Sequence, residues 1–151
     1  MNNEIIQRSW ESGDKKMEWV QSYMPVLNSI KDRFIKEKPF AGLRITMSIH
    51  LEAKTAYLAT VLRSGGAEVR VTGCNPLSNQ DDVADALRAM GFVVHAKHGA
   101  NPEEYVEHLK SALSINPHLI IDDGGDLIEL LHGECSEFGN SLIGGCEETT
   151  T

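Results

Sequence analysis

The stretch Leu119-Ile120-Ile121-Asp122-Asp123-Gly124-Gly125-Asp126 decides the fold of this chain, because an apolar run stops abruptly in three carboxylates and two glycines. Such a run is typical of a strand in a buried parallel sheet, and ligands of open α/β sheets bind just beyond the carboxyl ends of these strands. The glycines allow a ligand or the backbone to come close, and neighbouring acids raise one another's pKa. The stretch therefore predicts a parallel sheet with a binding edge.

Strands and helices alternate on both sides of this stretch. Strands are predicted at residues 43–49, 67–72, 92–96, 118–121 and 142–146. Helices are predicted between them, at 52–63, from a capping-box pattern at 78–81 to Gly91, from the N-cap Asn101 to Leu113, and at 127–132. This alternation indicates a three-layer, doubly wound parallel sheet of the Rossmann or flavodoxin type, with right-handed crossovers.

The first 41 residues are predicted to form an N-terminal helical segment that packs on an α/β domain of residues 42–151. Residues 1–14 are polar and predict a loose lead-in. From Met17 to Phe34 the apolar residues recur at helical spacing, and Pro25 predicts a break near Tyr23 and Met24.

Composition and charge narrow the possible functions. A chain of 151 residues fits one domain, and a net charge of −8 argues against a nucleic-acid or anionic-membrane surface. No apolar run approaches the roughly 20 residues of a membrane span, and the N-terminus lacks the basic start and apolar centre of a signal peptide. Three cysteines without a close pair predict reduced thiols and a cytoplasmic protein.

Four predicted strands end in reactive side chains. His50 follows the first strand, Cys74-Asn75-Pro76 the second, Asp122-Asp123 the fourth and Glu147-Glu148 the fifth. Because the carboxyl ends of parallel strands lie on one edge, a single cleft can collect an imidazole, a thiol, an amide and several carboxylates.

Each of these pieces also has a purely structural interpretation. His50 can be a helix-entry residue, residues 122–126 a tight turn with a helix cap or a weak magnesium site, and residues 147–149 the capped start of a helix. The magnesium interpretation lacks phosphate-binding glycines and a nearby lysine, and no histidine has metal-site spacing, so no metal is predicted. Convergence on one edge favours functional roles for His50, Asp123 and Glu148.

Several motifs resemble the N-terminal part of S-adenosylhomocysteine hydrolase (adenosylhomocysteinase), in order and over nearly the whole chain. They are MPVL at 24–27, EKPFAGLRI at 37–45, GAEV at 66–69, CNPLSNQD at 74–81, DDGGDL at 122–127 and EETTT at 147–151. The resemblance implies the substrate-binding domain of an enzyme that reversibly splits S-adenosylhomocysteine into adenosine and homocysteine. In the family, tightly held NAD oxidises the ribose 3′-hydroxyl, elimination and hydration follow, and the NADH then reduces the ketone.

The resemblance also implies roles for single residues. His50 and Asp123 match the family's acid–base pair near C5′ and the leaving sulfur, and Glu148 matches the residue that contacts the ribose. Thr149, Thr150 and Thr151 match threonines that touch NAD. The implied partners are therefore a nucleoside thioether and homocysteine, with no nucleic acid and no membrane.

One departure concerns the purine base. The better-known members have a threonine and a glutamate at the adenine, where this chain has Glu52 and Lys54. A charged lysine only donates, so it fits the 6-carbonyl of hypoxanthine better than the 6-amino group of adenine, and Glu52 can accept the N1 proton of hypoxanthine. The pair favours S-inosylhomocysteine as substrate. In the alternative, Lys54 turns outward and Glu52 alone receives the adenine amino group.

A second departure is length. The family's NAD-binding domain, with its glycine-rich loop, is absent from this chain, which is expected to be inactive alone and to bind nucleosides weakly. The complete enzyme is expected to be a homo-oligomer, a tetramer in the family. The alternative from another class is a stand-alone nucleoside-binding module without catalysis, which a stop codon directly after Thr151 would favour.

Overall fold

The computed structural model describes residues 2–148, and their side chains from residue 9 onward. The described residues form one five-stranded sheet with the order β3-β2-β1-β4-β5, in which every neighbouring pair is parallel. Its strands are β1 (Arg44–Ser48), β2 (Glu68–Thr72), β3 (Val93–His95), β4 (Leu119–Asp122) and β5 (Gly144–Glu147). The predicted parallel α/β fold is confirmed.

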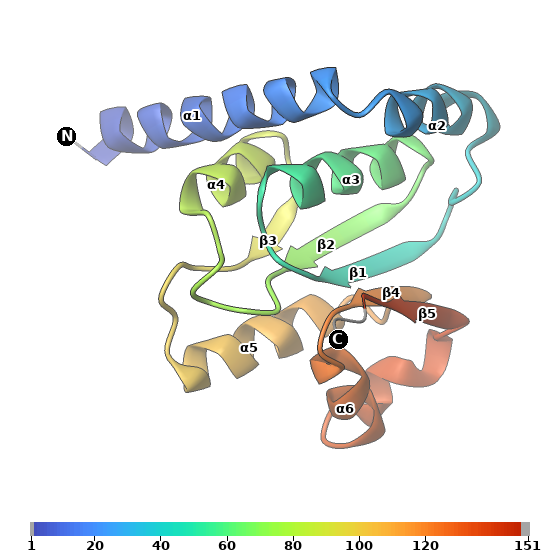
Figure 1. Cartoon of the computed structure of the whole chain (residues 1–151). Helices are drawn as coiled ribbons and strands as arrows, with labels where there is room; N and C mark the ends of the chain where they lie inside the picture. Colours follow the sequence, from blue (N-terminus) through green and yellow to red (C-terminus); the bar gives the residue numbers. More distant parts are fainter. Residues whose placement is uncertain (1, 149–151) are drawn as a thin grey trace.

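Helices cover both faces of the sheet (Figure 1). One face carries α3 (Ala53–Ser64) and α4 (Asp81–Ala89), and the other carries α5 (Pro102–Leu113), α6 (Asp126–His132) and a short 3-10 helix, η1 (Ser136–Ser141). The first helices, α1 (Asn2–Ser22) and α2 (Pro25–Glu37), lie outside α3 and α4 and pack on them (Figure 1). The sheet and its two helix layers thus carry an additional outer helical layer on one side.

The strands of the sheet centre are buried on both faces, as their unbroken apolar character predicts. Ile45 and Met47 of β1 belong to the core under α3 and α4, whereas Ile120 of β4 belongs to the core under α5 and α6. On the α5 side, the Thr46 hydroxyl donates to the carbonyl oxygen of Ala112 at 3.1 Å. Successive side chains of β1 therefore point to opposite faces of the sheet, Ile45 and Met47 toward α3 and α4, and Thr46 toward α5.

The prediction of a loose lead-in at residues 1–14 was wrong, because α1 begins at Asn2. Ile6, Trp10, Gly13 and Met17 recur at helical spacing in this part of α1, Trp10 packs against the core, and the helix lies close to α4. Ser12 Oγ donates to the Asp82 carboxylate at 2.7 Å, and a side chain at Gly13 would collide with the Asp82 carbonyl. The predicted break is confirmed, since α1 ends at Ser22 and α2 begins at Pro25.

The sheet has one topological switch point. From β1 the chain winds outward through β2 to β3, then returns across the sheet and winds the other way through β4 to β5. The loops after β1 and β4 therefore diverge at the centre of the carboxyl edge, which is where ligands bind in such sheets. No helix of the described part of the chain is long and apolar enough to cross a membrane.

Candidate active site

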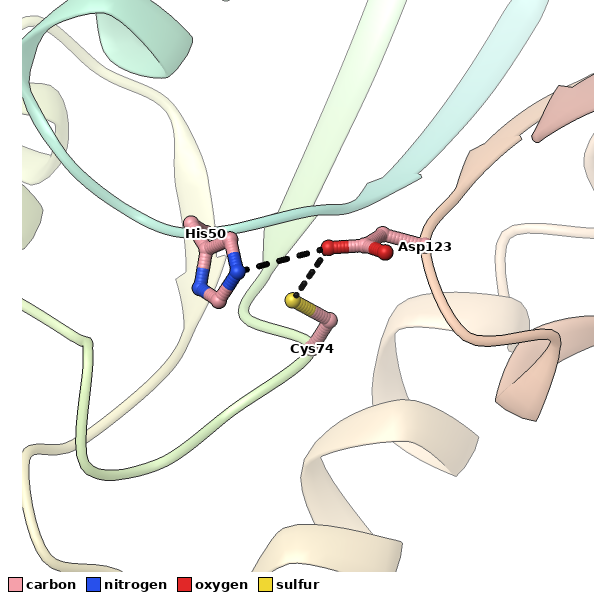
Figure 2. Close-up of side chains that lie close together, drawn as sticks. All are labelled: His50, Cys74 and Asp123. Carbon is pink, nitrogen blue, oxygen red and sulfur yellow. Dashed lines mark hydrogen bonds and ion pairs between the residues drawn. The ribbon is translucent and has the colours of Figure 1, made fainter. Parts of the chain in front are cut away.

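Three side chains from three strand ends meet at the switch point (Figure 2). His50 follows β1, Cys74 follows β2 and Asp123 follows β4. One Asp123 oxygen, Oδ2, accepts a hydrogen bond from the Cys74 thiol at 3.2 Å and lies 3.5 Å from His50 Nε2. The second distance exceeds that of a hydrogen bond, so imidazole and carboxylate face each other without being locked together.

Ser78 holds the His50 ring from its other side. The Ser78 Oγ lies 2.7 Å from His50 Nδ1 and 2.9 Å from the carbonyl oxygen of Asn75. Because a hydroxyl has one hydrogen, donating it to the Asn75 carbonyl leaves Oγ to accept a hydrogen bond from Nδ1–H. In the neutral ring this tautomer turns an unprotonated Nε2 toward Asp123.

The predicted capping box at 78–81 was wrong, because the Ser78 hydroxyl is used elsewhere. Helix α4 begins after Gln80 without a side-chain cap, since the Ser78 hydroxyl bonds His50 and the Asn75 carbonyl instead. The sequence pattern of a capping box contains no information about a histidine that arrives from another strand.

Asp122 is a structural neighbour of the site. It is fully buried; its Oδ1 accepts from the Asp123 N–H at 3.1 Å, and its Oδ2 accepts from the N–H groups of Leu127 and Ile128 at 3.0 and 3.2 Å. Burial raises the pKa of Asp122, and the nearby Glu147 charge raises it further, while the three N–H donors act in the opposite direction. The helix-cap interpretation of the acidic stretch therefore holds for Asp122, which leaves Asp123 to face the cleft.

Hydrogen bonds hold the loop between β4 and α6 in place at both ends. Gly124 and Gly125 have φ values of 90° and 81°, which residues with a side chain rarely adopt. The Glu147 carboxylate accepts from the Gly124 N–H at 2.7 Å, and the Tyr105 hydroxyl lies 2.5 Å from the Asp126 carboxylate. These contacts use oxygens that a magnesium ion would need, and they fix the backbone that carries Asp123.

Cys74 is a protonated thiol at neutral pH. Burial, the hydrogen bond to Asp123 and the charges of Asp123 and Glu148 together raise the pKa of Cys74 to about 12. The thiol is thus a hydrogen-bond donor to Asp123 and a poor nucleophile. Its surroundings are strongly negative.

A cavity of about 680 Å³ adjoins this group, between the start of α2 and the start of α3. Ile49, Thr55 and Glu148 line it, and the Thr55 hydroxyl donates to the His50 carbonyl oxygen at 2.6 Å. The remaining walls are mostly apolar, from Met24, Leu27, Ile30, Leu58 and neighbouring residues. This volume lies within the range of pockets that hold small organic molecules.

Glu52, Lys54 and Glu148 all lie on the wall of this cavity. A Glu52 oxygen accepts from the Lys54 N–H at 3.1 Å and so caps α3. Within the described part of the chain, no carboxylate lies within ion-pair distance of the Lys54 ammonium group. Glu52 and Lys54 also line a second cavity of about 660 Å³ on the α1 side.

Five of the residues predicted for the site lie in two adjoining groups at the carboxyl edge of the sheet. Glu52, Lys54 and Glu148 line the cavity, and His50 and Asp123 face each other at the strand ends beside it. Thr149, Thr150 and Thr151 lie outside the described residues. Sequence reasoning missed Ser78 as the partner of His50, and no pattern in the sequence could have indicated it.

The described residues do not fit NAD. A dinucleotide needs a glycine-rich turn between the first strand and the following helix, so that the backbone can approach the pyrophosphate. The turn from β1 to α3 reads Ile49-His50-Leu51-Glu52 and contains no glycine. No chemical step through NAD can be derived from these residues.

The fold and the site define an α/β protein with an imidazole–carboxylate pair at the switch point of a parallel sheet, beside a cavity for a small molecule. The family model of S-adenosyl-L-homocysteine hydrolase matches residues 3–150. The chain belongs to this family.

Several curated relatives are about half identical to it. An S-inosyl-L-homocysteine hydrolase from Methanocaldococcus jannaschii is 54% identical over 94% of this chain and 34% of that protein. An adenosylhomocysteinase from Archaeoglobus fulgidus is 50% identical over 92% of this chain and 34% of that protein. An adenosylhomocysteinase from Thermotoga maritima is 51% identical over 93% of this chain and 35% of that protein. The chain thus spans about a third of the length of the relatives it matches.

Proposed function

We propose that these residues form the substrate-binding part of an S-adenosylhomocysteine hydrolase-type enzyme. The enzyme would reversibly split a nucleoside thioether into a nucleoside and homocysteine. The observation that carries the proposal is the His50–Asp123 pair, 3.5 Å apart, beside a cavity of nucleoside size. Family membership supports the same reaction.

His50 and Asp123 are the proposed catalytic residues. Proton transfer requires a group that can both accept and release a proton within reach of the reacting atoms. The Ser78-held imidazole offers Nε2, and the Asp123 carboxylate faces it with one tightly placed oxygen. We assign to them the protons moved at C5′ and at the leaving sulfur, and to Glu148 the contact with the ribose hydroxyls.

NAD would be held by parts of the enzyme outside these 151 residues, with Thr149, Thr150 and Thr151 at its edge. When bound, it would supply oxidation and reduction at the ribose 3′ carbon. The described chain would bind and orient the thioether, and alone it would not turn over substrate. We further propose a cytoplasmic homo-oligomer, and residues 1–41 as a helical segment on the α/β domain; the three free thiols support the cytoplasmic location.

The test uses the full-length enzyme with His50→Ala and Asp123→Asn. Both variants should suppress homocysteine release far more than the formation of bound NADH, because both side chains would act at C5′ and not at the 3′-hydroxyl. His132→Ala, at the exposed end of α6, is the matched control and should behave as the unmodified enzyme. Loss of NADH formation in proportion to turnover would contradict the assigned roles.

A second candidate substrate is S-inosylhomocysteine. The Lys54 ammonium group, on the cavity wall without a carboxylate partner among the described residues, is the observation that favours it. Lys54 is exposed in this structure, and a bound base would cover it. A covered donor facing the adenine amino group would cost about 1–3 kcal/mol, whereas the hypoxanthine carbonyl would accept from it. Relatives with either substrate in their names match this chain about equally well, so identity does not separate the two.

The two substrates can be separated by kinetics. The full-length enzyme should have a higher kcat/KM for the inosyl than for the adenosyl thioether, and Glu52→Thr with Lys54→Glu should reverse the order. A preference of the unmodified enzyme for the adenosyl thioether would contradict the inosyl assignment.

A further inference from the structure

The side chains of His50, Cys74 and Asp123 have the chemistry of a metal site as well as that of a proton-transfer site. They bring an imidazole nitrogen, a thiol sulfur and a carboxylate oxygen within 4.8 Å of one another (Figure 2). Such a mixed nitrogen, sulfur and oxygen set suits Zn²⁺. We propose that these three side chains bind one Zn²⁺ ion through His50 Nε2, Cys74 Sγ and Asp123 Oδ2, with the fourth position open.

The distances between the donor atoms are close to the edges of a zinc tetrahedron. Zinc bonds of about 2.0 Å to nitrogen and oxygen and about 2.3 Å to sulfur give edges of about 3.3 Å for nitrogen to oxygen and about 3.5 Å for sulfur to oxygen. The observed distances are 3.5 Å for His50 Nε2 to Asp123 Oδ2 and 3.2 Å for Cys74 Sγ to the same oxygen. The three donor atoms lie within 4.8 Å of one another, so the third edge, between nitrogen and sulfur, must shorten to at most about 3.5 Å when the ion binds.

The partners of these ligands also suit a metal. A zinc-binding histidine usually donates its second ring N–H to a fixed acceptor, and the Ser78 Oγ lies 2.7 Å from His50 Nδ1. The His50 side chain is 49% exposed and that of Asp123 only 10%, so an ion can enter past the imidazole and reach a sheltered carboxylate. Among the described residues, the only ion-pair partner of Asp123 is His50 itself.

The charges balance when the ion binds. The Cys74 thiol loses its proton to solvent, the sulfur–zinc bond replaces the sulfur–hydrogen bond, and thiolate and carboxylate together neutralise Zn²⁺. If the proposed function holds, the ion also coordinates both proton-transferring side chains, His50 and Asp123, and so blocks proton transfer. The full-length enzyme is then expected to lose turnover in zinc and to regain it with EDTA.

The test is a zinc titration of this chain by calorimetry, with Co²⁺ as a spectroscopic probe. We expect one Zn²⁺ per chain and, with Co²⁺, the near-ultraviolet charge-transfer band of a cobalt–thiolate bond. His50→Gln, Cys74→Ser and Asp123→Asn should each weaken zinc binding at least about 100-fold. Mutating even a residue that only hydrogen-bonds to a metal ligand lowers metal affinity about 10–100-fold. Cys74→Ser should also abolish the cobalt band.

Cys146→Ser is the matched control, because Cys146 is an exposed thiol on β5. It should leave zinc affinity and the cobalt band unchanged. His50→Gln alters a half-exposed side chain, so its circular dichroism should match that of the unmodified chain. Unchanged zinc affinity in any of the three ligand variants, or a cobalt complex without the thiolate band, overturns the site. Zinc binding without inhibition of the full-length enzyme contradicts instead the roles assigned to His50 and Asp123.

Discussion

Replacing Asp122 by asparagine should destabilise the fold, because its two oxygens serve three backbone N–H groups. In asparagine one oxygen becomes an NH₂ donor, so at least one of these buried N–H groups loses its acceptor whichever way the amide turns. A buried unsatisfied donor costs about 1–3 kcal/mol. The neutral amide avoids the burial of a charge, which offsets part of the loss, so we expect a net loss of about 1–2 kcal/mol, in the lower part of that range.

The measurement is thermal unfolding of the chain at pH 7. For a chain of this size, about 4 °C is lost per kcal/mol, which gives a Tm lower by about 4–8 °C. The neighbouring variant Asp123→Asn is the matched control, since Asp123 accepts only the Cys74 thiol and faces His50. An Asp122→Asn protein as stable as the unmodified one, or less damaged than Asp123→Asn, would refute the capping role.

The pH profile offers a second check on Asp122. Burial, with help from Glu147, raises its pKa above the usual 3.8, so the folded protein keeps this proton after the unfolded chain has lost it. The contribution of Asp122 to stability therefore falls as pH rises from 3.8 to the raised value, and it is constant above that value. The deficit of Asp122→Asn should accordingly be largest at low pH and shrink across this window.

Two further predictions concern the neighbours of the His50–Asp123 pair. Ser78→Ala should lower kcat of the full-length enzyme by about 10–100-fold with little change in KM, because the imidazole loses the group that orients it; steady-state homocysteine release measures this. Ser22→Ala, whose hydroxyl bonds only its own helix, is the control, and an equal effect of both would contradict the orienting role. In alkylation followed by mass spectrometry, the exposed Cys146 should react quickly at pH 8 and Cys74 very slowly, since a pKa of about 12 leaves about one thiolate in ten thousand. Similar labelling rates for the two thiols would contradict the raised pKa of Cys74.

The sequence by itself determined the sheet and the edge on which the site lies. The apolar runs before Asp122-Asp123 and before His50 predict buried strands from their composition alone. The helices between the strands indicate parallel pairing. Because parallel strands have their carboxyl ends on one edge, the order of elements places His50 and Asp123 on the same edge, whereas their contact depends on β1 and β4 being neighbours in the sheet.

Only the tertiary structure decided which partner each polar side chain takes. The first half of α1 is stabilised by its packing on α4, which comes close at Gly13, and by Trp10 against the core, although most of its residues are polar. Ser78 serves His50 instead of α4, and Cys74 reaches Asp123 across 49 residues of chain. Hydrogen bonds and metal geometry depend on atoms within a few ångströms, and a sequence fixes such distances only along its own backbone, not between separate strand ends.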